Sequence, residues 1–436
     1  MDAILEQAGK LKEALTDFVF DAEGDLAVAL ETFSAEQMAL ATQQEMNQRN
    51  LLVDRFIAEG KVGQKTPIKL FLEAHTDLSS SDRQLLQRWE NSFLGLFEII
   101  TILDDGFELM NWTTAKHYIV KPTDQKMQES MKRYKIGEIL LTQIAPLEDY
   151  WIFSSPCRTF GKLGKPKLAV AIGNFKQNYG LHLYSDAPDL LAEAWISVEK
   201  SHQDFVKFFG DDEITLPGYQ LNQKFTEFQN TNLQEKLEAT GLDGTKTIQD
   251  LAQEAGISSD EIESVATEMG VDPTVFNSQK ITKMVQPKME LPAYLKKAEQ
   301  VTAFSHPRWG QSFLTNYSDF KKLLIEDEVN VSNAETLVMQ YLKSPEVNYG
   351  IWQKLVQQDP KSLELILQKV LNRPTFVLKQ DLSSLMKEFK KPTEPILPES
   401  ASVPLHLHTL FQDAVIEVNK DKSKNKATKK ASGKGF

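Results

Sequence analysis

The 436-residue chain has a single cysteine, Cys157, and no long apolar run. One thiol cannot form an internal disulfide, and it excludes zinc sites built from several cysteines. No window holds eighteen uninterrupted apolar residues, which excludes a membrane-spanning helix, and charged residues close to Met1 exclude a cleavable signal. We therefore expect no integral membrane segment and a reducing compartment, either cytoplasmic or similar to the plastid stroma.

The sequence also lacks a complete catalytic, metal-binding or nucleotide-binding motif. GKLGKP, residues 161–166, has no Ser or Thr after its lysine to hold magnesium, so it predicts a basic turn. His406 and His408 follow Pro404 at the start of a helix, where residues two apart point in different directions. We therefore expect no cofactor, no metal and no catalytic residue, and we interpret the protein as non-enzymatic. An enzyme with an unrecognised site is an alternative.

What is present is the composition of a globular protein, with 41% hydrophobic and 25% charged residues. At this length several domains are expected. The predicted fold class is α+β and predominantly α-helical, with a small antiparallel β-barrel inserted between helical regions. The expected segments are a helical region at 1–94, the barrel at 95–180, a helical region at 181–240, an acidic helix-turn-helix-like module at 241–285, a helical bundle at 286–391, a Pro-rich linker and last helix at 392–418, and a disordered tail at 419–436.

The helical region at 1–94 is predicted from apolar residues at helical spacing, beginning with Ala3 to Val19. Ser81 with Gln84 predicts a capping box for a later helix. From Gly95 the spacing changes to that of strands. Five short strands are predicted in GLFEIITIL, FELMNW, AKHYIV and GEILLTQIAPLEDYWIFSS, with a hairpin turn at residues 104–106 and a break at Ala145-Pro146.

Short strands with these turns favour a small barrel of the SH3 or OB kind. Barrels that bind single-stranded nucleic acid expose aromatic residues interleaved with basic ones. Aromatic residues at strand spacing lie in the core more often than on such a platform, so we expect most of these to be buried. The residues available for either role are Trp112, Lys116, His117, Tyr118, Lys121, Tyr150 and Trp151.

The segment TIQDLAQEAGISSDEIESVATEMG, residues 247–270, has the spacing of two short helices meeting at Gly256. Its exposed face is acidic and has no lysine or arginine, so contact with a nucleic-acid groove is disfavoured. The pattern resembles small helical modules of bacterial translation initiation factors and ubiquitin-associated-type bundles. We predict either local packing or a protein-docking face, which would include Asp260, Glu261, Glu263 and Glu268.

The tail at 419–436 has a net charge of +6, which leaves −18 for the rest of a chain of net charge −12. It lacks large apolar residues before Phe436, so we expect disorder. The tail either increases solubility or serves as an electrostatic tether to RNA, an anionic membrane surface or an acidic partner. The lysines that would form the tether are Lys420, Lys422, Lys424, Lys426, Lys429, Lys430 and Lys434.

Residues 306–310, His-Pro-Arg-Trp-Gly, form a dense local cluster. Arg308 could hold an anion of a partner, with Trp309 beside it. The alternative is a structural corner in which Trp309 is buried and Arg308 is paired with an acid. The acidic corner at Gly210 to Glu213 predicts a solvated turn, because three consecutive acids do not surround a cation as a calcium loop does.

The part of the chain from residue 51 to 160, with a short helix running into GLFEI, an acid-glycine turn and a later strand beginning GEILL, resembles uncharacterised bacterial proteins that often end in a zinc-binding SEC-C motif. The cysteine cluster of that motif is absent here, so the resemblance implies no metal ligand and no function. The chain as a whole resembles conserved proteins of cyanobacteria and plastids.

These patterns predict a protein-interaction or assembly factor that acts through helical docking surfaces. The alternative is an RNA- or ribosome-associated regulator that uses the barrel face and the basic tail. The sequence leaves open the partner's identity, the oligomeric state and the accessibility of Cys157.

Overall fold

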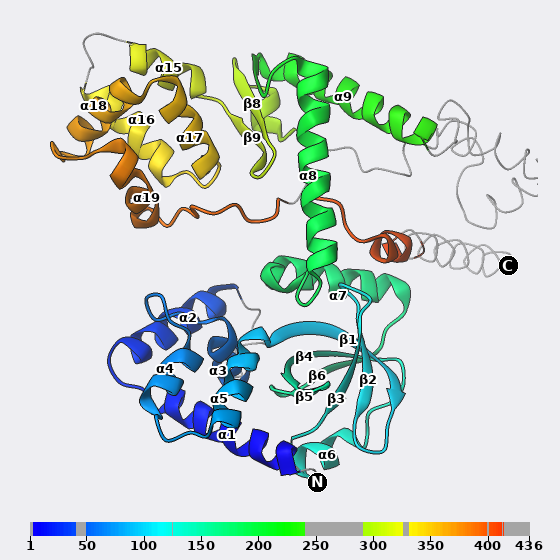
Figure 1. The fold of residues 1–436 in the computed structure, drawn as a ribbon. Helices are drawn as coiled ribbons and strands as arrows, with labels where there is room; N and C mark the ends of the chain where they lie inside the picture. The colour runs from blue at the N-terminus through cyan, green and yellow to red at the C-terminus, as the bar shows by residue number, and fades with distance from the viewer. Residues whose placement is uncertain are drawn as a thin grey trace, which may run out of the picture. The chain divides into compact units, whose positions relative to one another are not determined.

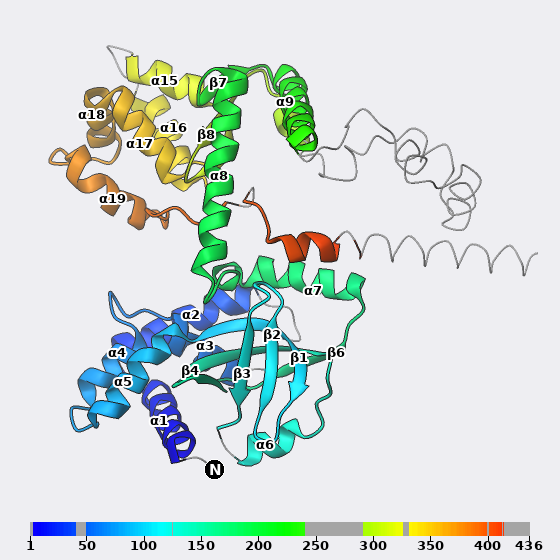
Figure 2. The ribbon, with the colours of Figure 1, turned by 45° about the vertical axis from the view of Figure 1, so that its right-hand side comes forward.

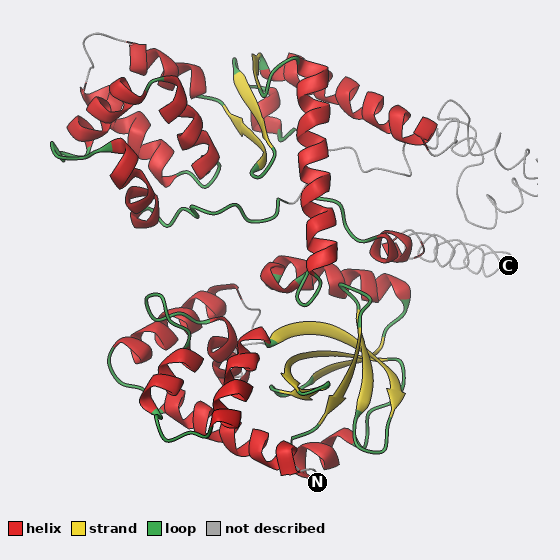
Figure 3. Cartoon of the chain, in the orientation of Figure 1, coloured by secondary structure: helices red, strands yellow, loops and turns green. Residues whose placement is uncertain are grey.

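The computed structural model describes residues 3–40, 49–123, 125–239, 291–325, 331–398, 401–411 and 413. The contacts divide the chain into two compact units, one formed by residues 1–191 and 403–419 and the other by residues 192–402 and 420–436. The boundary between them falls within a single helix, α8 (Pro188–Phe209). The chain thus leaves unit 1, forms unit 2 and returns to unit 1. Helices predominate among the described residues, as Figure 3 shows.

Unit 1 begins with helices that pack against the outside of a barrel (Figure 1). The helices are α1 (Ala3–Phe20), α2 (Asp25–Leu40), α3 (Arg49–Glu59), α4 (Pro67–Ala74), α5 (Ser80–Arg88) and the 3-10 turn η1 (Trp89–Asn91). The capping box expected at Ser81 is wrong by two residues. Ser79 caps α5, because its hydroxyl accepts the Asp82 backbone N–H at 3.1 Å.

The barrel of unit 1 has five strands closed by pairing of the first with the fourth, and a sixth strand attached to the fourth. The strands are β1 (Phe93–Ile102), β2 (Phe107–Asn111), β3 (His117–Lys121), β4 (Glu138–Leu147), β5 (Tyr150–Phe153) and β6 (Arg158–Lys162). Their order is β1-β2-β3-β5-β4-β6, and α6 (Gln125–Met131) connects β3 to β4 (Figure 2).

Two details of the predicted barrel are corrected. The barrel is not wholly antiparallel, because β3 and β5 run parallel with Val120 opposite Trp151. The expected break at Ala145-Pro146 does not occur, since both residues pair with β5 and the chain turns one residue after Leu147. Glu148 makes this turn in the left-handed region, at φ 51°.

Nearly continuous apolar runs in β1 and β4 follow from burial on both faces. One face lines the barrel interior with Phe97, Leu140 and Phe153. The other face, with Leu96 and Leu141, is covered by α7 (Lys165–Asn178) and by the returning segment around Leu407 and Leu410. The predicted basic turn at 161–166 is in part the end of β6 and the N-terminus of α7.

Unit 2 has a three-stranded antiparallel sheet of order β7-β8-β9 with helices on both faces. The strands are β7 (Glu213–Leu216), β8 (Val301–His306) and β9 (Gly310–Leu314). One face packs on α8, α9 (Gly218–Ala239) and α14 (Ala293–Lys296). The other packs on α15 (Tyr317–Ile325), α16 (Val331–Lys343), α17 (Tyr349–Gln358), α18 (Pro360–Val370) and α19 (Leu378–Glu388).

The sheet corrects the expectation that residues 286–391 form only helices. Alternate residues of β8 divide between the two faces, so Val301 and Ala303 enter the core with α8 and α9, while Phe304 enters the core of the α15–α19 bundle. None of the described helices is long and apolar enough to cross a membrane.

Candidate functional site

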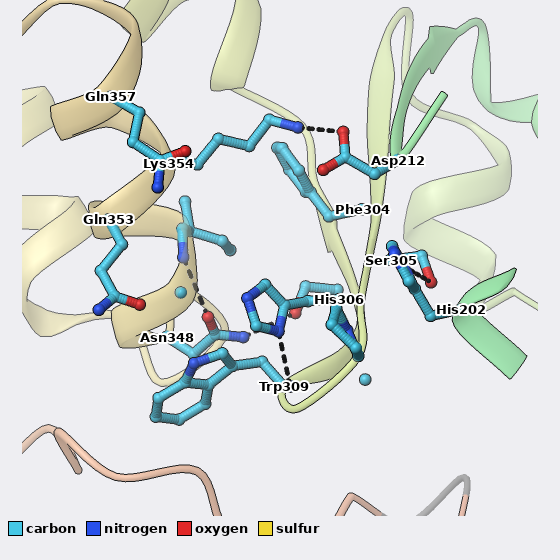
Figure 4. A pocket seen from close by; sticks show the side chains of 15 residues that line it. His202, Asp212, Phe304, Ser305, His306, Trp309, Asn348, Gln353, Lys354 and Gln357 are labelled. Carbon is cyan, nitrogen blue, oxygen red and sulfur yellow. Dashed lines mark hydrogen bonds and ion pairs between the residues drawn. The ribbon is translucent and has the colours of Figure 1, made fainter. Parts of the chain in front are cut away.

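A cavity of about 230 Å³ lies in unit 2 between the β8–β9 hairpin and α17. Figure 4 shows the hairpin on one side and the helix, with Gln353, Lys354 and Gln357, on the other. Of the residues singled out from the sequence, Asp212, His306, Pro307, Trp309 and Gly310 line this cavity, and Arg308 does not. Imidazole, carboxylate, amide and ammonium groups converge here with Trp309 and Phe304, which makes the cavity the candidate site.

The hairpin turn fixes the tautomer of His306. Gly310 adopts φ 68°, a left-handed conformation that suits glycine, and the turn directs the backbone N–H groups of Arg308 and Trp309 toward the His306 ring. Nδ1 accepts both, at 3.0 and 3.2 Å. The ring is therefore neutral with its hydrogen on Nε2, and no described residue supplies a hydrogen-bond acceptor for that hydrogen.

Burial lowers the pKa of His306, and neighbouring His202 lowers it further, although the Asp212 carboxylate acts in the opposite direction. The neutral form is also the form that keeps both turn hydrogen bonds. Geometry and electrostatics thus agree on a neutral hydrogen-bond donor facing the cavity.

Trp309 forms a wall of the cavity against the start of α17. A Cβ at Gly350 would lie 2.5 Å from a ring carbon of Trp309, so only glycine leaves room for the indole. Tyr349 approaches the same ring edge-on, with centroids 6.4 Å apart. Trp309 is half-buried rather than buried as expected for a structural corner, because one side of its ring borders the cavity.

Arg308 contacts an aromatic ring. It is exposed, and its guanidinium carbon lies 4.0 Å from the centroid of the Trp195 ring on α8. The expected pairing with an acid is therefore replaced by a cation–π contact. The sequence could not indicate this, because Trp195 is more than a hundred residues away along the chain.

A cluster of ions closes one end of the cavity. Lys354 of α17 contacts the Asp212 carboxylate directly and lies 3.4 Å from Glu213. Lys321 of α15 lies 2.7 Å from the other Glu213 oxygen. Burial opposes ionisation of Asp212, but the hydrogen bond and charge of Lys354, together with a contribution from Asp211, outweigh it and lower the pKa of Asp212. The predicted solvated turn at 210–213 is thus wrong for its last two acids, which bind lysines of the bundle.

Ser305 and His202 also line the cavity, and they meet on the face of β8 opposite to Phe304 and His306. The Ser305 hydroxyl lies 3.2 Å from His202 Nδ1, a separation typical of a nucleophile and its base. Two observations argue against that role. Ser305 is only 4% exposed, and the nearest cavity carboxylate, Asp212, is engaged by Lys354 rather than orienting His202. The contact serves the packing of α8 on the sheet.

The barrel aromatics are largely interior, as expected. Tyr118 is buried, and Trp151 packs against the same barrel core. Trp112 packs between the barrel and α7, with its indole N–H donated to Glu98 at 3.0 Å. On the outside of the barrel, His117 pairs with Glu108 at 2.9 Å. The platform of exposed aromatics typical of single-stranded nucleic-acid binding is therefore absent from the described barrel strands.

The remaining predicted residues do not join this site. Cys157 is half-buried beside Thr142 and Tyr134, and burial raises the pKa of its thiol to about 12, which makes it a poor nucleophile. The acids predicted for docking, Asp260, Glu261, Glu263 and Glu268, and the tail lysines lie outside the described residues. Within the described ranges, no three His, Cys, Asp or Glu residues cluster as metal ligands would.

Sequence reasoning missed His202, Asn348, Lys354 and the two glutamines of α17 as cavity residues. They come from elements far apart in the sequence and have no local motif. Comparison with protein families, with curated proteins and with solved structures finds no match to this chain.

Proposed function

We propose that this protein is a non-enzymatic interaction or assembly factor that docks a partner protein at the hairpin cavity of unit 2. The observation that supports this most directly is the size of the cavity. Pockets for cofactors and drug-sized molecules usually hold roughly 300–1,000 Å³. About 230 Å³ is less than that, and it suits one anchoring side chain of a partner.

The state of the polar groups supports binding over catalysis. His306 uses Nδ1 to hold the turn, so it lacks a free base on that atom. Lys354 is engaged by carboxylates. What faces the cavity is a fixed neutral donor and an indole, a combination that recognises a shape and a hydrogen-bonding group. The acidic residues at 247–270 and the lysine tail stay proposed as further docking and tethering surfaces.

Site-specific photocrosslinking tests this function. A benzoylphenylalanine at Gln353, at the mouth of the cavity, should crosslink a defined partner protein in cells, and nuclease treatment should not change the yield. The same group at Gln340, an exposed position on α16 that does not line the cavity, is the matched control. Equal crosslinking from both positions, or no protein adduct from Gln353, would contradict the proposal.

A second candidate is RNA association through the barrel and the tail. The observation in its favour is the strand order, in which β1-β2-β3-β5-β4 closes on β1, β3 is parallel to β5 and a helix lies between β3 and β4. We propose an OB-type barrel on this ground. OB barrels bind oligonucleotides on the β2–β3 face and the loops after β1 and β4.

RNA association is the second candidate because the loops after β1 and β4 are acidic. Asp104 and Asp105 follow β1, and Glu148 and Asp149 follow β4, so acids flank the face. Its test is truncation after Asn419, which should abolish salt-sensitive RNA retention if RNA association holds. Retention that survives the truncation would remove the tail from the proposal.

A further inference from the structure

The free edge of β9 borders the cavity. β9 pairs only with β8, and among the described residues no backbone group outside β8 bonds to Gln311, Ser312 or Phe313. In an antiparallel pair, every second residue points its N–H and C=O away from its partner. β9 therefore offers unpaired backbone groups along one side.

The faces of β9 connect this edge to the cavity. The register places Ser312 opposite Phe304 and Gly310 opposite His306, so these residues share the face toward α17. Gly310 and Ser312 both line the cavity. A strand added beside β9 would point its alternate side chains to the same face, which places one of them at the cavity.

We propose that β9 accepts an extended segment of a partner protein as a fourth strand, and that one uncharged side chain of this segment with an oxygen acceptor, Asn or Gln, enters the cavity. The proposal rests on the interaction function above and names its recognition mode. Backbone hydrogen bonds supply affinity in this mode, and the pocket supplies specificity.

The preference for an oxygen acceptor follows from the groups that line the cavity. The His306 Nε2–H faces it without a described acceptor, and the exposed amides of Gln353 and Gln357 stand at its mouth. Lys354 and Lys321 are balanced by Asp212 and Glu213, so the site does not attract a strong charge of either sign.

A second copy of this chain is a poorer occupant. If two β9 strands paired antiparallel, each would present Gly310, Ser312 and Leu314 to the cavity face of the other. Leu314 is buried in the core of its own unit, with only 3% of its surface exposed, so it cannot enter the cavity of a second copy. Glycine and serine are too small to fill about 230 Å³. A partner with a longer polar side chain fills the space that a second copy leaves empty.

The test begins with hydrogen exchange of the full-length protein, where the outward amides within Gln311–Phe313 should exchange within seconds. Slow exchange in the free protein would mean that another part of the chain or a second copy already pairs with the edge of β9. Light scattering would distinguish these two cases by the mass of the particle. Either result would overturn the proposal.

A random peptide library is then selected against the full-length protein. Selected peptides should share an acceptor side chain, slow the exchange of β9, and bind at least tenfold more weakly to Gln353→Trp, which fills the mouth of the cavity, while Gln340→Trp leaves binding unchanged. His306→Asn keeps an acceptor for the turn through its side-chain oxygen and removes the ring donor, so it should also weaken binding.

Two outcomes separate this inference from the proposed function. Crosslinking of a partner at Gln353 without protection of β9 leaves the interaction function intact and refutes strand addition. Failure of both refutes both. Peptides that bind Gln353→Trp as well as wild type would also overturn the proposal, because the cavity would then play no part.

Discussion

β6 and β9 are both edge strands, but only β6 has the charged residues and the register shift that oppose pairing with a further strand. β6 reads RTFGK, with Arg158 and Lys162 at its ends, and a register shift interrupts its pairing with β4 near Gly161, which has φ 66°. Charges and bulges of this kind prevent further strands from adding. β9 reads GQSFL, with no charge and no register shift along β8. Unit 1 thus protects its edge, whereas unit 2 leaves one open beside a cavity.

One partly buried polar group in each unit illustrates a second difference. In unit 1, Glu59 is bound by both nitrogens of the Arg55 fork at 2.9 and 3.0 Å and lies 2.9 Å from His182. Arg55 in turn stacks on Tyr179, 4.9 Å from its ring centroid. In unit 2 the corresponding donor, His306 Nε2–H, faces a cavity. Glu59 therefore finds its partners within unit 1, whereas the His306 donor of unit 2 is left facing a cavity.

The largest predicted effect is loss of the Glu59 charge. Although burial opposes ionisation, the bonds from His182 and Arg55 lower the pKa of Glu59 to about 2 from an ordinary 4.5. Glu59→Gln removes the carboxylate that binds the buried Arg55 charge, and unit 1 should lose about 3 kcal/mol of unfolding free energy. The stabilisation is fully present above pH 4.5 and is lost as the pH falls toward 2. Denaturant titration with segment-resolved hydrogen exchange measures each unit separately.

The control is Glu73→Gln, which breaks an exposed pair with Lys65 and should change little. If Glu59→Gln lowers the stability of unit 2 by the same amount as unit 1, the two units unfold together and the comparison between them fails.

The next effect concerns the ion cluster of unit 2. Lys354→Met removes the ammonium between Asp212 and Glu213, leaving Asp212 without a lysine while Lys321 still pairs with Glu213. Because Lys354 is mostly buried and Asp212 is partly exposed, we expect a cost of roughly 2 kcal/mol, confined to unit 2. The companion variant Lys322→Met breaks an exposed pair on α15 and should be neutral. Equal loss in both variants would mean that the cluster adds nothing specific.

Much of the barrel could be predicted from the sequence. The turn at 104–106 separates two strands that differ in pattern, and the apolar runs of β1 and β4 are long enough to mark strands buried on both faces. The parallel pairing of β3 with β5 could not be predicted, because it joins strands separated by a helix and another strand and has no local signature.

Less of the candidate site could be predicted from the sequence. The sequence predicts that the cluster at 306–310 holds an anion or forms a structural corner. It does not predict the turn of a hairpin, because the flanks VTAFS and QSFL are too short to give a strand period. His202, Asp212 and Lys354 meet only through tertiary packing. The role of Arg308 was misjudged because its partner is an aromatic ring instead of an acid.

A smaller effect is expected from the pH dependence of unit 2. Burial lowers the pKa of His306 in the folded protein, so the folded state binds fewer protons than the unfolded state near the ordinary pKa of 6.5. Its contribution is complete above pH 6.5 and declines as the pH falls through the lowered value. His306→Asn should flatten this part of the unit 2 stability profile between pH 7 and 5 and leave the profile of unit 1 unchanged. If the slope of unfolding free energy against pH in unit 2 does not change in this variant, the pH dependence belongs to another group.

The smallest effect on stability, and the sharpest test of the contrast between the two edges, comes from giving β9 the charge that β6 has. Gln311 is half-buried, and its amide oxygen has no described partner. In Gln311→Lys the long stem can carry the ammonium to water, so unit 2 should change by less than about 0.5 kcal/mol. Binding of library-selected peptides should nevertheless weaken at least tenfold, because a lysine on an edge strand opposes strand addition. Gln340→Lys on α16 should leave binding unchanged. If Gln311→Lys binds as wild type does, the open edge of β9 is not what the peptides recognise, and the difference between the two edge strands has no functional meaning.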